Sequence, residues 1–253
     1  MSRLSEKFSK QKVLITFITA GDPNLLATEN LIYQLEKAGA DIIELGVPFS
    51  DPLADGPVIQ ASHLRALKKN VSLADVFKLV SKVRKKTQIP ICFMLSYNLI
   101  LKYGMEKFYE YAEKSGVDGV IVPDLPPEES KVQSSKSPVD SIFLVAPTST
   151  DERIRLAAER SSGFIYLISV TGITGKRERL EEDLKELISR IRRYSRLPVA
   201  IGFGISKPSQ AAQVAKIADG VIVGSAIVDL IAKKKFKAVS KFVSSLRKAI
   251  DAG

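Results

Sequence analysis

The stretch Ala38-Gly39-Ala40-Asp41-Ile42-Ile43 recurs in altered form as Ser115-Gly116-Val117-Asp118-Gly119-Val120 and as Ile217-Ala218-Asp219-Gly220-Val221. In each copy a helical pattern ends, often at a glycine that can adopt the left-handed conformation of a helix C-terminal cap. An apolar run begins directly afterwards. A helix-to-strand junction that repeats along a chain is typical of proteins in which strands and helices alternate. The repeat therefore predicts an α/β fold.

Short runs rich in Val and Ile occur eight times in the sequence. Continuous apolar runs of this length are typical of strands that are buried on both faces, as in a parallel sheet. The runs are Val13–Thr19, Asp41–Gly46, Ile91–Leu95, Gly119–Val122, Ser141–Val145, Phe164–Ser169, Val199–Gly202 and Gly220–Val223.

Helical patterns separate these strands. The clearest are Asn24–Lys37, Ser72–Lys85, Asp151–Arg160, Leu180–Tyr194 and Pro208–Ile217. The segment Pro126–Asp140 has few apolar residues, so the helix between the fourth and fifth strands is expected to be short or degenerate. Eight strands alternating with helices predict a closed (β/α)₈ barrel that spans residues 1–253 as one domain. If one strand were assigned wrongly, an open doubly wound sheet would be the alternative fold.

The composition is that of an ordinary soluble protein. The chain has 253 residues, of which 45% are apolar and 26% are charged. Its longest apolar stretches are too short to cross a bilayer, and the N-terminus lacks the pattern of a secretory signal. Cys92 is the only cysteine, which excludes a disulfide within the chain. We therefore expect a cytoplasmic protein with no membrane partner.

The net charge is +10, which fits either an anionic partner or a solvated, Lys-rich surface. The basic clusters at residues 84–86 and 233–235 lie near predicted helix ends, where cations complement the helix dipole. Aromatic residues are not interleaved with these clusters, as a nucleic-acid-binding platform would require. The pattern favours the solvated surface, with no nucleic-acid partner.

Candidate catalytic residues follow the second strand, because barrel active sites lie at the C-terminal ends of the strands. Glu44 lies between Ile43 and Leu45 in an apolar strand, and Asp55 follows on the next loop. Burial would raise the pKa of Glu44 toward neutrality, and two carboxyl groups in different environments can take different acid–base roles. The alternative is that Glu44 belongs to a structural ion pair and Asp55 is a turn residue.

Candidate phosphate-binding residues follow the last two strands. Gly202-Phe203-Gly204-Ile205 follows the seventh strand, and Gly224-Ser225 follows the eighth, just before a predicted helix. Barrel enzymes often bind phosphate at this position, through backbone N–H groups at a helix N-terminus. Tight turns without a ligand are the alternative. After the sixth strand, Gly172-Ile173-Thr174-Gly175 suggests a loop that closes over a ligand; a plain surface loop is the alternative.

For several other residues of reactive types, the sequence gives weaker reasons to assign a catalytic or metal-binding role. His63 is the only histidine and lies in a helical stretch, so a surface or packing role is favoured over catalysis. One His and one Cys cannot form a credible zinc site. Asp118, Asp124 and Asp219 fall at different ends of their strands, which argues against a shared metal ion. No lysine is centred at a strand end as a Schiff-base aldolase would need.

The segment Glu44-Leu45-Gly46-Val47-Pro48-Phe49-Ser50-Asp51-Pro52-Leu53-Ala54-Asp55-Gly56-Pro57 resembles the signature of the tryptophan synthase α-subunit family. The resemblance spans nearly the whole chain in the family's order. It continues in residues 17–23 (FITAGDP), 97–98 (YN), 123–129 (PDLPPEE), 172–175 (GITG), 202–205 (GFGI) and 224–225 (GS).

The resemblance implies a lyase that splits indole-3-glycerol phosphate into indole and glyceraldehyde 3-phosphate. Glu44 would remove the proton of the side-chain hydroxyl and deliver a proton to indole C3, and Asp55 would accept from the indole N–H. Thr174 corresponds to the lid threonine that hydrogen-bonds Asp55, and Tyr166 to a supporting residue in the pocket. The implied phosphate site is Gly175, Gly204, Gly224 and Ser225, and the implied indole pocket is Phe17, Leu95, Tyr97, Ile121 and Phe203.

The resemblance also implies a partner. Members of the family work as an αββα complex, in which indole passes to a β subunit that carries pyridoxal phosphate; this chain itself is expected to need no cofactor or metal. The loops with Asp51, Pro52 and Tyr97–Leu101 correspond to the contact surface. A short segment before the first strand, a short Lys131–Asp140 stretch and the pair Val170-Thr171 depart from the usual pattern. These departures put the shape of the interface in doubt more than the reaction.

Two other functions stay open. Another phosphate-binding barrel enzyme would explain the glycine loops but not the segment from Glu44 to Asp55. A non-catalytic α-like chain that binds and activates a β subunit would not need Glu44, Asp55 and Thr174 together.

Overall fold

The computed structural model describes residues 2–52, 55–130, 137–169, 177–202 and 204–253. In these residues, parallel strands form one sheet in the order β5-β4-β3-β2-β1-β9-β8-β7-β6. The strands are β1 (Val13–Thr19), β2 (Ile42–Gly46), β3 (Ile91–Met94), β4 (Gly119–Ile121), β5 (Asp140–Ile142), β6 (Leu144–Val145), β7 (Ile165–Ile168), β8 (Val199–Gly202) and β9 (Gly220–Val223).

The two edges of this sheet, β5 and β6, are consecutive pieces of one predicted strand. They are separated by Phe143 alone, so the chain itself joins the edges and closes the ring. The Phe143 N–H donates to the hydroxyl of Ser161 instead of to a neighbouring strand, which interrupts the ladder. The closed barrel is therefore confirmed, the fifth of its eight predicted strands is divided in two, and the open doubly wound alternative is wrong.

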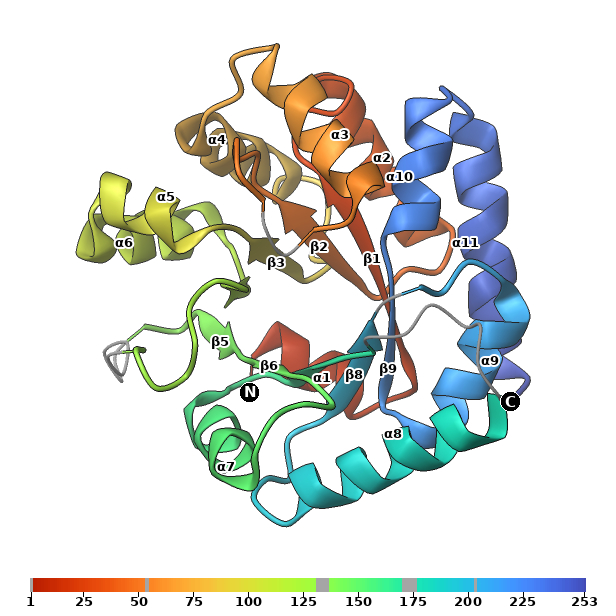
Figure 1. Cartoon of the computed structure of the whole chain (residues 1–253). Helices are drawn as coiled ribbons and strands as arrows, with labels where there is room; N and C mark the ends of the chain where they lie inside the picture. The colour runs from red at the N-terminus through yellow and green to blue at the C-terminus, as the bar shows by residue number, and fades with distance from the viewer. Residues whose placement is uncertain (1, 53–54, 131–136, 170–176, 203) are drawn as a thin grey trace.

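Helices surround the ring of strands (Figure 1), except the first, which packs its apolar side chains into the interior of the ring. They are α1 (Arg3–Phe8), α2 (Leu25–Lys37), α3 (Pro57–Leu67), α4 (Leu73–Val83), α5 (Tyr97–Tyr103), α6 (Met105–Ser115), α7 (Asp151–Arg160), α8 (Arg177–Arg192), α9 (Pro208–Ile217), α10 (Ser225–Ala232) and α11 (Phe236–Asp251). Ser72 and Asp75 form a reciprocal capping box at the start of α4. Between β4 and β5 the described residues form turns and no helix, as the polar composition of that segment predicts.

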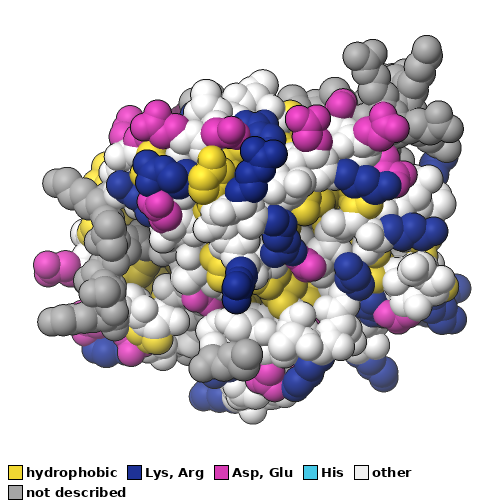
Figure 2. Space-filling model, turned by 90° about the horizontal axis from the view of Figure 1, so that it is seen from below, with side chains coloured by type: hydrophobic (Ala, Val, Ile, Leu, Met, Phe, Trp, Pro, Cys, Tyr) yellow, Lys and Arg dark blue, Asp and Glu magenta, His cyan; other side chains and the backbone are white. Residues whose placement is uncertain are grey.

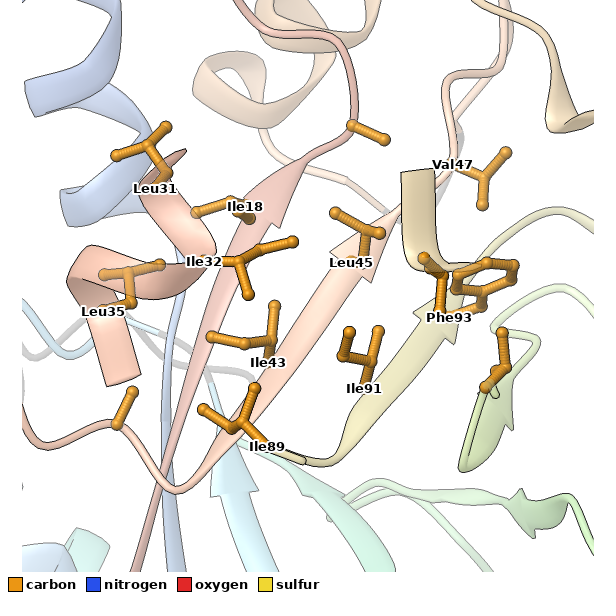
Figure 3. Packing of buried hydrophobic residues seen from close by; sticks show 14 of the residues in the cluster. Ile18, Leu31, Ile32, Leu35, Ile43, Leu45, Val47, Ile89, Ile91 and Phe93 are labelled. Carbon is orange, nitrogen blue, oxygen red and sulfur yellow. The ribbon is translucent and has the colours of Figure 1, made fainter. Parts of the chain in front are cut away.

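Apolar side chains fill both surfaces of the barrel wall. Outside it, Leu31, Ile32 and Leu35 of α2 face Ile18 of β1 and Ile43 of β2 (Figure 3). The inside holds a separate cluster, to which α1 contributes Leu4 and Phe8 and the strands contribute Val13, Ile15, Ile42, Cys92, Ile121, Ile142, Phe164, Tyr166, Ala200 and Ile222. The barrel is thus a packed core, as is usual for this fold, and a ligand site is expected at its C-terminal end.

The charged surface is mixed in sign. Lys and Arg side chains are interspersed with Asp and Glu side chains on the face shown in Figure 2. This mixture fits the predicted solvated surface better than a single basic patch. In the described part of the chain, no helix is long and apolar enough to cross a bilayer.

The three aspartates that end or precede strands have separate structural partners. Asp118, before β4, accepts from Arg84, Arg3 and the N–H of Ile91. Asp219, before β9, is paired with Arg192. Asp124 lies after β4, at the other end of the barrel, and accepts from Ser96 Oγ and the Tyr97 N–H. The three residues therefore lie at different ends of their strands, as predicted. The described residues contain no group of three or more His, Cys, Asp or Glu side chains placed to hold a metal ion.

Candidate active site

A cavity of about 400 Å³ opens at the C-terminal ends of the strands. Strands β1, β2, β3, β7 and β9 and the segments after β2, β7, β8 and β9 contribute to its wall. The lining residues are Phe17, Glu44, Asp55, Gly56, Pro57, Val58, Ile59, Met94, Tyr166, Ser169, Gly204, Ile205, Ile222, Gly224 and Ser225. The two predicted catalytic carboxyl groups and three of the predicted phosphate-site residues therefore share one cavity.

Glu44 lies in the middle of β2, where the alternation of side chains along the strand points it into the barrel. Its neighbours across the sheet are Phe17 of β1 and Cys92 of β3, and its exposure is only 1%. The atom Oε2 has no hydrogen-bond partner among the described residues. Burial, with a smaller contribution from the nearby charge of Asp55, raises the pKa of Glu44 to about 8.

Asp55 lies on the segment between β2 and α3. Its N–H donates to the carbonyl of Pro52, and its carbonyl accepts from the side chain of Gln60 in the first turn of α3. The side chain is 13% exposed, and burial raises the pKa of its carboxyl group to about 6.

The two carboxyl groups consequently differ in charge near pH 7. Glu44, with a pKa of about 8, is mainly protonated, and Asp55, with a pKa of about 6, is mainly ionised. A pair whose pKa values are separated by their environments supplies a proton donor and a negative charge in one cavity. Among the described residues Glu44 has no ion-pair partner, so none of them supports the alternative of a structural ion pair at Glu44.

One end of the cavity is suited to an anion. Gly224 and Ser225 stand at the N-terminus of α10, where the first N–H groups of a helix have no partner within the helix. Gly204 has a φ of +73°, and no atom lies within 4 Å of the position that a Cβ would take there. Backbone N–H groups can therefore approach a phosphate at this end without a side chain in between.

The rest of the wall is apolar and suits a flat ring. Phe17 and Tyr166 are nearly fully buried, and Met94, Ile205 and Ile222 complete this part of the wall. A Cβ on Gly202 would lie 2.5 Å from the Tyr166 hydroxyl, so the glycine makes room for that side chain. Burial, with the nearby Glu44 and Asp55, raises the pKa of Tyr166, which stays protonated at neutral pH.

A second cavity of about 170 Å³ adjoins the first and shares Phe17, Met94 and Asp55 with it. Leu95 lines only this second cavity. Its other lining residues are Val47, Phe49, Asp51, Pro52, His63, Ser96, Asn98, Pro123 and Asp124. This cavity therefore reaches the loops that the family resemblance associates with a partner.

Some predicted residues lie elsewhere. Ile121 is fully buried in the barrel interior, and the half-buried Tyr97 packs against the cluster outside the barrel wall; neither lines the two cavities. Thr174, Gly175 and Phe203 lie outside the described residues, so their predicted roles stay predictions.

His63 takes the packing side of its predicted surface or packing role. Its exposure is 4%, and Nε2 is 3.5 Å from Oδ2 of Asp55. The sequence contains no signal for this contact, because it depends on tertiary folding. Pocket residues such as Met94 and Ile59 were missed for a similar reason, since an apolar residue beside a site looks like any core residue.

Comparison with known proteins agrees with this geometry. The family model described as tryptophan synthase alpha chain matches residues 4–251. A tryptophan synthase alpha chain from Thermoanaerobacter sp. (strain X514) is 48% identical over 99% of this chain and 100% of its own length. The crystal structure of tryptophan synthase subunit alpha from Legionella pneumophila superposes with a TM-score of 0.92 at 38% identity, with all of both chains covered.

A chain in the crystal structure of tryptophan synthase from M. tuberculosis, aminoacrylate-bound form, superposes with a TM-score of 0.89 at 33% identity over 99% of this chain and 100% of that one. The family match and the full-length relatives lead to one conclusion: the chain belongs to the tryptophan synthase alpha chain family.

Proposed function

We propose that Glu44 and Asp55 are the acid–base pair with which this chain carries out the lyase reaction of its family, the cleavage of indole-3-glycerol phosphate to indole and glyceraldehyde 3-phosphate. The observation that carries the proposal is that two buried carboxyl groups, whose pKa values burial raises to different degrees, line one cavity that also has an anion-binding end. A retro-aldol cleavage of this substrate needs a proton donor, a negative charge and a phosphate anchor.

The ionisation of the pair sets the order of proton transfers. Protonated Glu44 gives its proton to indole C3, and ionised Asp55 accepts from the indole N–H and stabilises the positive ring. The Glu44 carboxylate then removes the proton of the side-chain hydroxyl as the carbon–carbon bond breaks. The bond electrons restore the aromatic indole, the hydroxyl carbon becomes the aldehyde, and Glu44 is protonated again.

Positioning comes from the two ends of the cavity. The phosphate binds at the N-terminus of α10 and at Gly204, and the ring lies against Phe17. An anchored tail and a fitted ring hold C3 near the buried carboxyl group, which lowers the entropic part of the barrier.

The partner belongs to this proposal. A β subunit that carries pyridoxal phosphate docks on the loops around Asp51, Pro52 and Asn98, next to the second cavity. Indole released beside Phe17 then leaves through the second cavity, which shares that residue with the first. The proposal places no cofactor in this chain.

A cleavage assay on the purified chain tests the function. We expect indole to form from indole-3-glycerol phosphate slowly with the chain alone and about 10-fold or more faster with a β subunit of a family member, because closing the site excludes water and completes its geometry. Glu159→Gln, on the exposed surface of α7, is a control for a Glu-to-Gln substitution at Glu44 and should behave like the wild type. If no indole formed with or without the β subunit, the binding-only alternative would replace the enzyme.

A further inference from the structure

His63 is a buried polar residue that the proposed reaction does not use. It lies on α3, its side chain is 5% exposed, and Nε2 has no hydrogen-bond partner among the described residues. A buried donor without a partner carries an energetic cost, so its retention in the wall of a site calls for a reason.

A backbone hydrogen bond fixes the protonation state of the ring. The N–H of Phe49 donates to Nδ1 of His63 at 3.0 Å, so Nδ1 carries no proton. In a neutral imidazole the proton then lies on Nε2. Burial lowers the pKa of His63 to about 4, against an opposing effect of Asp22, so the ring is neutral in the range where the carboxyl groups titrate.

The acceptor within reach of Nε2 is Asp55. Oδ2 lies 3.5 Å from Nε2, although no hydrogen bond joins the two atoms, and a long contact of a catalytic group commonly tightens when substrate binds. A Cβ on Gly46 of β2 would strike the ring of Phe17 at 2.5 Å and would lie 3.7 Å from Nε2, so His63 and Phe17 both lie beside this glycine. His63 lines the second cavity but not the first, so its effect on a substrate in the first cavity passes through Asp55.

We propose that His63 is a positioning residue for Asp55: its Nε2–H donates to Oδ2. This hydrogen bond keeps the Asp55 carboxylate ionised, fixes its orientation and leaves Oδ1 to accept from the indole N–H. This inference rests on the proposed role of Asp55. His63 thus contacts Asp55 from the side that faces away from the indole ring and orients it, as an orienting group does for a catalytic base.

The charges around the pair agree with this assignment. Among the described residues, the titratable groups coupled to or in contact with Asp55 are Glu44, Tyr166 and His63. With Glu44 and Tyr166 protonated, the negative charge of the group lies on Asp55, and a neutral donor on His63 favours that charge. The Asp22 carboxylate near His63 is paired with Arg65 by two hydrogen bonds, at 2.8 and 2.7 Å, whereas the carboxylate recorded within 4 Å of Nε2 is that of Asp55.

Two variants test the roles of the two ring nitrogens of His63 separately. His63→Asn keeps a side-chain oxygen near the position of Nδ1 for the Phe49 N–H but has no group at the position of Nε2. His63→Gln places an amide N–H near the position of Nε2. We expect His63→Asn to lower kcat about 10-fold at pH 7, with KM little changed, and to move the acid limb of the kcat profile about one pH unit upward. We expect His63→Gln to keep most of the wild-type kcat and to show the acid limb of the kcat profile at the wild-type pH.

Dependence on Asp55 is tested in a double-variant cycle. If His63 acts through Asp55, His63→Asn has no further effect on kcat in an Asp55→Asn background. An unshifted acid limb in His63→Asn, an equal loss in His63→Asn and His63→Gln, or an additive double variant would each overturn the inference. A wild-type chain that cleaves the substrate, together with an inactive Asp55→Asn, would in that case leave the proposed function standing. Absence of cleavage by the wild type would instead remove both.

Discussion

Glu44→Gln is expected to lower kcat for indole-3-glycerol phosphate cleavage by about 10²- to 10⁴-fold, with KM close to the wild-type value. The amide keeps the shape of the side chain but neither gives a proton to C3 nor takes one from the hydroxyl. Substrate binding depends mainly on the phosphate end at Gly224 and on the apolar wall, which the substitution leaves intact. Single-turnover rates measured at saturating substrate test this expectation.

Unfolding measurements supply the control for Glu44→Gln. The pKa of Glu44 is about 8 in the folded chain against an ordinary value of 4.5. Between these values the folded state binds more protons than the unfolded state, so the stability of the wild type falls as pH rises through this window. The variant does not titrate, and we expect it to unfold at higher denaturant concentration than the wild type at pH 8. An inactive but less stable variant would mean that the loss comes from misfolding.

Asp55→Asn is expected to lower kcat by about 10²- to 10³-fold, as for the loss of one group that stabilises developing charge. The amide removes the negative charge that faces the positive ring, and its oxygen is a weaker acceptor for the indole N–H. Binding of glycerol 3-phosphate, which occupies only the phosphate end, should stay within about twofold of wild type, because α10 and Gly204 are untouched.

The matched control for Asp55→Asn is Asp251→Asn, at the exposed end of α11 with a side chain that is 59% exposed. It should keep wild-type turnover. An Asp55→Asn variant with unchanged kcat would show that the ring does not need this carboxylate, and the acid–base pair would reduce to Glu44 alone.

The barrel was predictable because its strands are buried on both faces. Such strands form continuous apolar runs, and β1, β8 and β9 begin and end at the residues that the pattern gives. The division of the fifth strand was not predictable. It depends on the Ser161 hydroxyl, which comes from a segment beyond α7 and takes the Phe143 N–H out of the ladder; no local propensity encodes that contact.

The residues of the site were likewise only partly predictable from the sequence. Glu44 stood out because a carboxyl group inside an apolar strand requires either an ion-pair partner or a function. Gly224 stood out because glycine before a helix at the end of a barrel strand has a known use. His63 did not stand out, since a single histidine in an amphipathic helix is equally compatible with the surface and with the core. Its place beside Asp55 follows from tertiary folding of the loop before α3.

The pH dependence of kcat/KM for indole-3-glycerol phosphate cleavage tests the central claim, that one cavity holds a protonated Glu44 and an ionised Asp55. We predict that activity rises with pH through about 6, as Asp55 loses its proton, and falls through about 8, as Glu44 loses its proton. In Glu44→Gln the upper limb should disappear from the residual activity. A wild-type profile that stays flat between pH 5 and 9, or an upper limb that persists in Glu44→Gln, would contradict the account.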